Sequence, residues 1–211
     1  MRAAEGAPRP GPPGPFRRAP PARYYAGSVS QAPAPPARDA ADRPGLFLTF
    51  EGGDGVGKTT QTRILAEALR AEGVEVLVTR EPGGTDLGTE IRRLLLDGGH
   101  VDPRAEALLY AADRAHHVAT LVRPALERGA VVVSDRYLDS SVAYQGAARS
   151  LGAEDVRSLS LWATGGLLPD RTILLDADPV LADRRASGRG GRDRLERESD
   201  AFRAALREQF L

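Results

Sequence analysis

The clearest chemical signal in the sequence is a lone lysine that follows a run of glycines. Residues 52–59 read GGDGVGKT and fit the pattern G-x-x-x-x-G-K-[S/T], whose backbone N–H groups cradle phosphates. Lys58 would reach the β- and γ-phosphates of a nucleoside triphosphate, and the Thr59 hydroxyl would bind Mg²⁺. The residues expected to contact ATP are Gly52, Gly53, Asp54, Gly55, Val56, Gly57, Lys58, Thr59 and Thr60.

The use of basic residues strengthens this interpretation. Of the 29 Lys and Arg residues, 28 are Arg and only Lys58 is Lys. A chain that otherwise uses Arg retains Lys where a forked guanidinium would not fit. The alternative, an ordinary surface lysine in a glycine-rich turn, leaves that choice unexplained. We therefore predict binding of ATP or GTP.

A second candidate is the pair Asp135-Arg136, which follows the valine-rich stretch 130–134. An acid at the carboxyl end of a strand beside a phosphate loop can hold hydrated Mg²⁺, and a neighbouring Arg can fork onto a phosphate. The alternative is a solvated surface ion pair. The position after a strand favours the functional interpretation.

These residues need a framework that brings them to one edge. Short apolar runs predict strands at residues 46–51, 74–79, 130–134 and 172–175, and helical patterns lie between them. Alternation of strand and helix predicts an α/β fold, with a parallel sheet covered by helices on both faces and ligands at the carboxyl ends of the strands.

Two of the helices have apolar positions that we expect to be buried. In the helix at residues 59–72 these positions are Ile64, Leu65, Ala68 and Leu69. A second helix begins at Asp102-Pro103, a capping residue followed by proline. Its expected buried face consists of Ala105, Leu108, Leu109, Ala112 and Ala119.

Composition limits the class of protein. The chain has 211 residues, of which 41% are apolar, enough for one domain, which we place at residues 46–211. Equal numbers of acidic and basic residues, 29 each, give no electrostatic footprint for nucleic acid. The sequence has no cysteine and no apolar run of about 20 residues, so we expect a cytoplasmic protein without a membrane partner.

Residues 1–45 differ from the rest of the chain, since they contain 11 of the 16 prolines. They show neither helical nor strand periodicity, and we predict a disordered tail. Pro12, Pro15 and Arg17 fit a P-x-x-P-x-R pattern for a polyproline-binding groove. A transit peptide is the other alternative, because the tail is Arg-rich and poor in acids.

Four motifs together resemble one family. They are FEG with the phosphate loop at residues 50–60, TREPGGT at 79–85, DRY at 135–137 and AYQG at 143–146. In order and spacing they are similar to the bacterial thymidylate kinases, over residues 46 to about 210. The resemblance implies a three-layer P-loop kinase fold and a homodimer. It also implies transfer of the ATP γ-phosphate to dTMP with Mg²⁺.

The resemblance also implies roles for particular residues. Asp54 matches the loop acid that bridges the metal and the sugar 3′-hydroxyl, and Arg136 matches the arginine on the dTMP phosphate. The metal set is then Thr59, Asp54 and Asp135, and the catalytic residues are Lys58, Asp54, Asp135 and Arg189.

Four further residues match the family's nucleoside pocket. Tyr110 and Arg114 stand four apart on one helix face, where the family stacks thymine on an aromatic ring and bonds its O4. Ser141 falls at the position that contacts the N3 edge of the base. Tyr144 falls where an aromatic side chain crowds the 2′ position of the sugar.

Residues 185–194 resemble the family's lid over the phosphates. Gly53 and Gly55 leave the phosphate loop without an arginine, so stabilisation of the transferring phosphoryl group must come from elsewhere. We expect it from Arg189, with Arg185 and Arg192 as alternatives in the lid.

The alternatives in function are another P-loop nucleoside or nucleotide kinase, and a non-catalytic nucleotide-binding part of a larger chain. We expect a helix to start at Ser199 and Asp200 and to run to the final residue, Leu211, without a stop signal. The family places a further strand and helix after this point, so we expect the chain to lack them and to be C-terminally incomplete.

Overall fold

A parallel four-stranded sheet forms the centre of the computed structural model, which describes residues 45–187 and 199–210. These residues all fall within one structural unit, Arg38–Leu211. The strand order is β2-β3-β1-β4, with every neighbouring pair parallel. The strands are β1 (Leu46–Glu51), β2 (Val76–Arg80), β3 (Val131–Asp135) and β4 (Arg171–Leu174).

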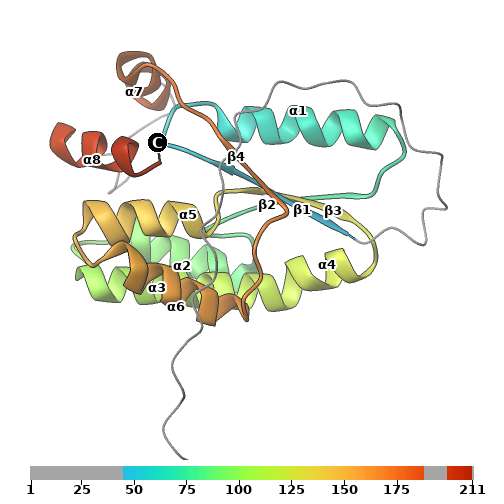
Figure 1. Cartoon of the computed structure of the whole chain (residues 1–211), viewed down its shortest axis with the longest axis horizontal. Coiled ribbons are helices and arrows are strands. Elements are labelled where there is room, and N and C mark those ends of the chain that lie inside the picture. Colours follow the sequence, from blue (N-terminus) through green and yellow to red (C-terminus); the bar gives the residue numbers. More distant parts are fainter. Residues whose placement is uncertain (1–44, 188–198, 211) are drawn as a thin grey trace, which may run out of the picture. The chain divides into compact units, whose positions relative to one another are not determined.

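Helices cover both faces of the sheet (Figure 1). Helix α1 lies on one face, while α2 to α6 gather on the other. Helix α3 continues through a π-helical segment, η2, into α4, and α5 continues through another, η3. The bounds are α1 (Lys58–Ala71), α2 (Asp86–Leu96), α3 (Pro103–His117), η2 (Val118–Val122), α4 (Arg123–Glu127), α5 (Leu138–Ser141), η3 (Val142–Ala148), α6 (Ala153–Thr164), α7 (Pro179–Ser187) and α8 (Asp200–Phe210).

The predicted α/β class is confirmed, and the four predicted strands appear within two residues of their expected bounds. Strand register places Arg80 opposite Asp135 and Phe50 opposite Asp135 on its other side. The carboxyl ends of β1, β2 and β3 therefore meet at one edge. The segments that follow these three ends carry the candidate site residues.

The expected buried face of α3 is wrong. Ala105, Ala112 and Ala119 are exposed, and Leu108 keeps 59% of its surface accessible, while Leu109 is half-buried. The buried side of the helix carries mostly polar residues, because it faces the candidate site rather than an apolar core. They are Glu106, Ala107, Tyr110, Ala111, Asp113, Arg114 and His117.

The expected face of α1 is correct in part. Leu65 and Leu69 are half-buried, but Ile64 is 48% exposed and Ala68 is exposed. The residues that α1 buries are Lys58, Thr62 and Ala66. Helix α1 therefore packs against the sheet through these three residues, which are spaced four apart from the phosphate loop onward. Ile64 lies on another side of the helix and faces solvent.

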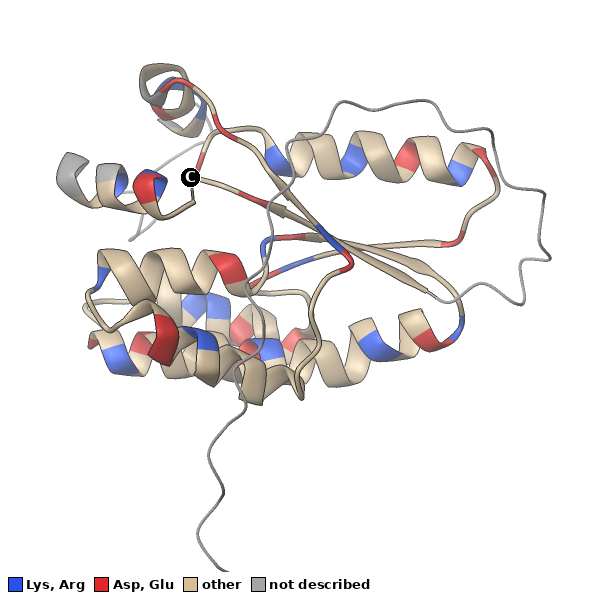
Figure 2. Cartoon of the chain, in the orientation of Figure 1, with Lys and Arg blue, Asp and Glu red and all other residues tan. Residues whose placement is uncertain are grey.

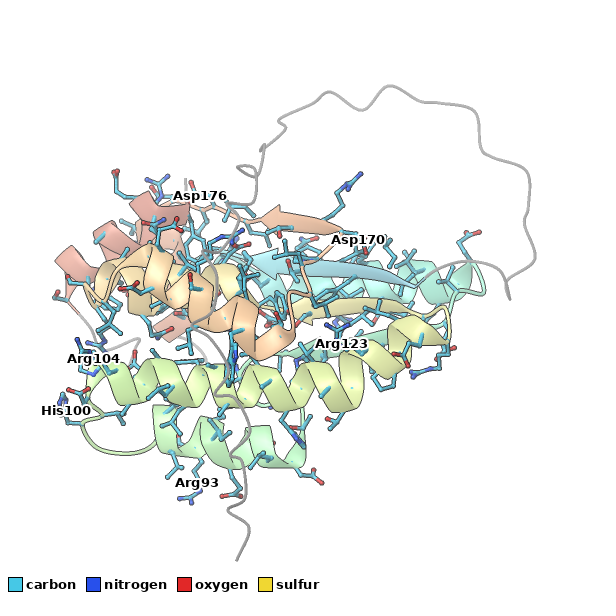
Figure 3. All side chains as sticks on the ribbon, turned by 60° about the horizontal axis from the view of Figure 1, so that its bottom comes forward. Arg93, His100, Arg104, Arg123, Asp170 and Asp176 are labelled. Carbon is cyan, nitrogen blue, oxygen red and sulfur yellow. The ribbon has the colours of Figure 1, made fainter. Side chains whose placement is uncertain are left out.

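Helix α8 packs its apolar side against the residues around η3. Leu206 is buried, and Phe202 and Phe210 pack against the same cluster, which includes Tyr110 and Tyr144. The Ser199 hydroxyl accepts a hydrogen bond from the Phe202 N–H, as expected of a helix start. Arg207 donates two hydrogen bonds to Asp176 (2.9 and 2.6 Å), and Figure 3 shows Asp176 beyond the end of β4.

Charges of both signs are interspersed along the helices (Figure 2). Figure 3 shows the Arg93, His100 and Arg104 side chains extending outward at the α2 and α3 side. Within residues 45–187 and 199–210, every helix is too short or too polar to cross a membrane.

Candidate active site

The phosphate loop is shaped by glycines that no other residue could replace without rearrangement. Gly52 (φ 127°) and Gly55 (φ 78°) adopt left-handed backbone conformations. A β-carbon on Gly55 would lie 2.0 Å from the Ala182 carbonyl oxygen, and one on Gly52 would lie 2.1 Å from that of Leu175. The loop is therefore held against the segment after β4 and against α7.

Lys58 lies inside this loop and is buried. Its Nζ donates to the carbonyl oxygens of Gly52 (3.0 Å) and Gly53 (2.5 Å). Burial, and then the charge of Arg136, lower the pKa of the amine to about 8. An anion placed among these groups would favour the protonated amine.

Thr59 and Asp135 come together as the sequence predicted. The Thr59 hydroxyl donates to Asp135 Oδ2 at 2.6 Å. A hydroxyl and a carboxylate are oxygen ligands of the kind that Mg²⁺ takes, in combination with phosphate oxygens and water. The part of the chain that the structure describes has no cluster of three acidic, His or Cys groups for a metal. Asp54 is engaged with other partners.

Arg136 connects the phosphate loop to α5 and η3 through hydrogen bonds. Its backbone is left-handed (φ 74°), which is uncommon for a residue with a side chain. Nη1 donates to the Gly52 carbonyl and to the Ser140 hydroxyl, both at 2.9 Å. Nη2 donates to Asp54 at 2.6 Å and to the Tyr144 hydroxyl at 3.1 Å. Lys58 and Arg136 thus converge on one oxygen, that of Gly52.

Asp54 completes this group of charges. One carboxylate oxygen accepts from Arg136, and the other accepts from the Tyr144 hydroxyl at 2.6 Å. Burial alone would raise the pKa of the carboxyl, but the charges of Arg136 and Lys58 outweigh it and hold the pKa well below its ordinary value. Asp54 therefore stays ionised.

Glu51 is a buried acid that sequence reasoning did not single out beyond its place in the FEG motif. Its carboxylate accepts from the Tyr137 N–H (2.8 Å) and from the Ser140 hydroxyl (2.5 Å). Burial, and then the charge of Asp139, raise its pKa to about 7. The two hydrogen bonds hold Tyr137, which follows Arg136 in the chain, and Ser140, whose hydroxyl accepts from Arg136.

The six residues predicted to bind the acceptor line one cavity. They are Asp54, Tyr110, Arg114, Arg136, Ser141 and Tyr144. The other lining residues are Glu81, Pro82, Arg92, Leu96, Tyr137, Ser140 and Gln145. Residues from α2, α3, α5 and η3, and from the segments that follow β1, β2 and β3, are therefore brought to a single pocket.

Arg114 is held on several sides by hydrogen bonds. Nε donates to Glu81 at 2.7 Å, and Nη1 donates to the Ser160 hydroxyl at 3.0 Å. Nη2 donates to the Ser141 hydroxyl (2.9 Å) and to the Tyr137 carbonyl (3.1 Å). Four of the five guanidinium N–H donors are used, which fixes the plane of the group.

Gln145 and Arg92 are pocket residues that the sequence reasoning missed. Gln145 is 1% exposed; its Nε2 donates to Glu106 at 2.9 Å, and its Oε1 has no partner. Arg92 donates to the Pro82 carbonyl at 3.1 Å and lines two cavities. Gln145 belongs to the AYQG motif, which was the one available signal.

The second cavity runs from the phosphate loop along α1 and β2. Its lining includes Lys58, Thr59, Asp135 and Arg185. The two cavities share Asp54, Glu81, Arg92 and Arg136. The other two predicted lid arginines, Arg189 and Arg192, lie outside the described residues.

Comparison with known proteins gives a consistent result. The family model described as thymidylate kinase matches residues 50–211. A thymidylate kinase of Leifsonia xyli is 64% identical over 172 residues, covering 81% of this chain and 82% of the relative. One of Clavibacter sepedonicus is 63% identical over 169 residues, covering 79% and 80%. A crystal structure of a thymidylate kinase from Ehrlichia chaffeensis has a TM-score of 0.66 and 33% identity, covering 79% of this chain and 84% of that one.

Proposed function

The chain belongs to the thymidylate kinase family, and we propose that it transfers the γ-phosphate of Mg·ATP to dTMP, giving ADP and dTDP. The cysteine-free composition suits the reducing cytoplasm, where we place this reaction.

The observation that carries the proposal is the convergence of two cations on the Gly52 carbonyl. Lys58 Nζ approaches it from the phosphate loop at 3.0 Å, and Arg136 Nη1 approaches it from the acceptor pocket at 2.9 Å. A donor phosphate on Lys58 and an acceptor phosphate on Arg136 would therefore meet beside this atom. Such proximity supports in-line transfer between two bound phosphates.

The transfer requires no covalent intermediate with the protein and no general base. An oxygen of the dTMP phosphate is already anionic at neutral pH, so it attacks the γ-phosphorus without a general base, and the bond to the ADP oxygen breaks. Lys58 and Arg136 neutralise charge on the two phosphates. Thr59 and Asp135 would hold Mg²⁺, which supplies further neutralisation of the phosphate oxygens. Arg189 remains our candidate for the lid arginine.

The pocket residues support thymine as the base. Tyr110 offers an aromatic face, and Arg114 is oriented by Glu81 so that its plane is fixed before a ligand arrives. We propose that Arg114 and Ser141 address the O4 and N3 side of the base. The unpartnered Oε1 of buried Gln145 would accept the N3–H.

Tyr144 and Asp54 support selection at the sugar. The Tyr144 hydroxyl bonds Asp54 at 2.6 Å and Arg136 at 3.1 Å, so the ring is anchored beside the acceptor phosphate site. We propose that this ring excludes a 2′-hydroxyl and that the Asp54 carboxylate receives the 3′-hydroxyl.

The exposed apolar stripe of α3 supports a homodimer. Ala105, Leu108 and Ala112 follow one another at helical spacing on the outer face. On the adjacent helix α6, Trp162 is 82% exposed. Exposed apolar side chains on two adjacent helices are typical of an interface, and we propose that a second copy of the chain covers them.

The deciding experiment measures ADP release from ATP with dTMP, dUMP, dCMP, dAMP and dGMP in turn. We expect dTMP to give the highest kcat/KM. The variant Lys58→Met should lower kcat with dTMP by at least about 100-fold, because it removes a charge from the transferring phosphates. The surface variant Arg93→Met is the matched control and should leave kcat unchanged.

Each alternative has its own outcome in this assay. A higher kcat/KM for another monophosphate would indicate a different nucleotide kinase. ATP binding without ADP release for any acceptor would indicate a non-catalytic nucleotide-binding protein. Equal turnover by Lys58→Met would remove the phosphate-loop assignment.

A further inference from the structure

Glu106 is a fully buried carboxylate that lies behind the acceptor pocket. It does not line the pocket, yet its Oε1 accepts a hydrogen bond from Gln145 Nε2 at 2.9 Å. Gln145 does line the pocket and is 1% exposed. Resting on the proposed function, we propose that Glu106 is a positioning residue for base selection. It fixes the Gln145 amide so that its carbonyl oxygen, and not its NH₂ group, addresses the ligand.

The chemistry of the pair allows only one orientation of the amide. An ionised carboxylate can accept hydrogen bonds but cannot donate them, whereas a primary amide has one end of each kind. If the Gln145 amide turned over, its oxygen would face the Glu106 oxygen, and both would lose their bond in a buried place. The NH₂ group therefore stays on Glu106, and Oε1 is left without a partner.

The positive charge of Arg149 also stabilises the Glu106 carboxylate. Arg149 approaches Glu106 at 3.5 Å, and its guanidinium carbon lies 5.1 Å from the centre of the Phe202 ring on α8. Glu106 is thus set between a cation and the Gln145 amide. Both neighbours complement a negative charge on Glu106, and a carboxylate is the form that dictates the orientation of Gln145.

The consequence is selection for a base that carries an N–H donor at the facing edge. Thymine and uracil present N3–H there, while cytosine presents an unprotonated N3 with no hydrogen. An acceptor-only site leaves two oxygen or nitrogen lone pairs facing each other when a cytosine ring binds. Glu106 would therefore discriminate against cytosine without touching the ligand.

The test compares dTMP with 5-methyl-dCMP, which keeps the methyl group and changes the N3 and C4 groups. In Glu106→Gln, the side chain at position 106 can either accept from Gln145 or donate to it, so the Gln145 amide can take both orientations. We expect the ratio of kcat/KM for dTMP over 5-methyl-dCMP to fall at least about tenfold, mainly through KM. Arg114 disfavours the 4-amino group in both proteins, so its effect cancels in the comparison. Glu90→Gln, on the surface, should keep the wild-type ratio.

A double variant that combines Glu106→Gln with Gln145→Glu separates positioning from a general structural role. The amide introduced at position 106 would then donate its NH₂ group to the carboxylate introduced at position 145, whose second oxygen faces the pocket as an acceptor. We expect this exchange to restore the preference for dTMP toward the wild-type ratio. A merely structural role of Glu106 would give no such recovery, and an unchanged ratio in Glu106→Gln would overturn the proposal.

The single variant Gln145→Glu keeps the idea testable if Glu106→Gln does not fold. Two facing carboxyl groups must share one proton. While that proton is present, the two groups bond each other, and the carboxyl introduced at position 145 keeps an acceptor oxygen toward the pocket. When it is lost at higher pH, the two carboxylates repel and this oxygen is displaced, so use of dTMP should decline as the pH rises from 6 to 9, relative to wild type. A pH profile parallel to that of the wild type would contradict the proposal. Absence of dTMP phosphorylation by the wild-type chain would instead contradict the proposed function.

Discussion

At the scale of single residues, the site depends on buried acids, Glu51 and Glu106, that line neither of its two cavities. Glu51 is 1% exposed and holds both the Tyr137 N–H and the Ser140 hydroxyl. Arg136 precedes Tyr137 in the chain, donates to the Ser140 hydroxyl at 2.9 Å and has a left-handed backbone. A non-glycine residue in that conformation is strained, and the neighbouring hydrogen bonds compensate for it.

Glu51 should make stability depend on pH. Its pKa is raised from an ordinary 4.5 to about 7 in the folded protein, so folding favours the protonated form. This contribution to stability is fully present below pH 4.5 and is lost as the pH rises to 7, because the carboxyl must then ionise in a buried place. Between pH 5 and pH 8 the wild type should lose roughly 2 kcal/mol relative to Glu51→Gln, which has no titrating group there.

The measurement is urea unfolding of both proteins at pH 5 and at pH 8, with the difference between them taken at each pH. Taking that difference cancels the titration of groups that do not interact with Glu51. A constant difference would mean that Glu51 does not ionise in this range. Asp97→Asn, which alters an exposed acid, is the control and should give no such change.

The sequence was sufficient to predict the residues of the phosphate loop and of the DRY motif, because each motif is defined by residue types at fixed spacing. Lys58, Thr59, Asp135 and Arg136 were predicted in this way, and the structure brings them together. Glu51 and Ser140 are 89 residues apart, and Gln145 and Glu106 are 39 apart. No local pattern reveals such a pair, since each partner alone resembles an ordinary polar residue.

At the scale of elements, η3 and α8 shape the acceptor pocket together. The π-helical segment η3 carries Tyr144 and Gln145, and widened turns of this kind are frequent at functional sites. Phe202 on α8 meets the Tyr144 ring edge to face, with 6.2 Å between centroids. Helix α8 therefore supports the back of the pocket.

Leu206→Ala should show this coupling. Leu206 is 5% exposed and packs in the cluster that contains Tyr110 and Tyr144. Loss of its side chain should lower the free energy of unfolding by about 2–5 kcal/mol and should raise KM for dTMP several-fold, with less effect on KM for ATP. Denaturant unfolding and initial rates check both expectations.

The matched control for this prediction is Gln209→Ala, an exposed position of the same helix. It should change neither stability nor KM. Equal increases of both KM values in Leu206→Ala would point to a general loosening of the fold, and α8 would then have no particular connection with the acceptor pocket.

At the scale of the whole molecule, the strand pattern was sufficient for the fold class. The four strands are short, apolar and separated by helical segments, and parallel pairing follows from that alternation. Helices α2 and α6 and the segment 138–148 were not predicted. The helix faces could not be assigned reliably, because periodicity shows that a stripe is apolar but not what covers it.

Helix α3 illustrates this limit. Its apolar stripe was expected in the core, but the core side is occupied by polar residues of the site, such as Glu106 and Arg114. The stripe lies outside instead. If a second copy of the chain covers it, the same apolar pattern is explained by an interface rather than by the interior of one chain.

Leu108→Arg tests that explanation. Leu108 is 59% exposed, so an arginine there should leave the fold of the single chain intact, but it would place two unpaired charges in a two-fold interface. We expect the dissociation constant of the dimer to rise by at least about 100-fold, corresponding to roughly 3 kcal/mol. Sedimentation velocity over a dilution series measures it.

The matched control is Ile64→Arg on α1, which lies against the opposite face of the sheet and is 48% exposed (Figure 1). Both substitutions replace an exposed aliphatic side chain in a helix with the same charge, so they differ only in the face that they alter. The dimer should persist in Ile64→Arg and dissociate in Leu108→Arg. Dissociation by both variants, or by neither, would contradict an interface on α3, because its effect must be confined to the face on which the stripe lies.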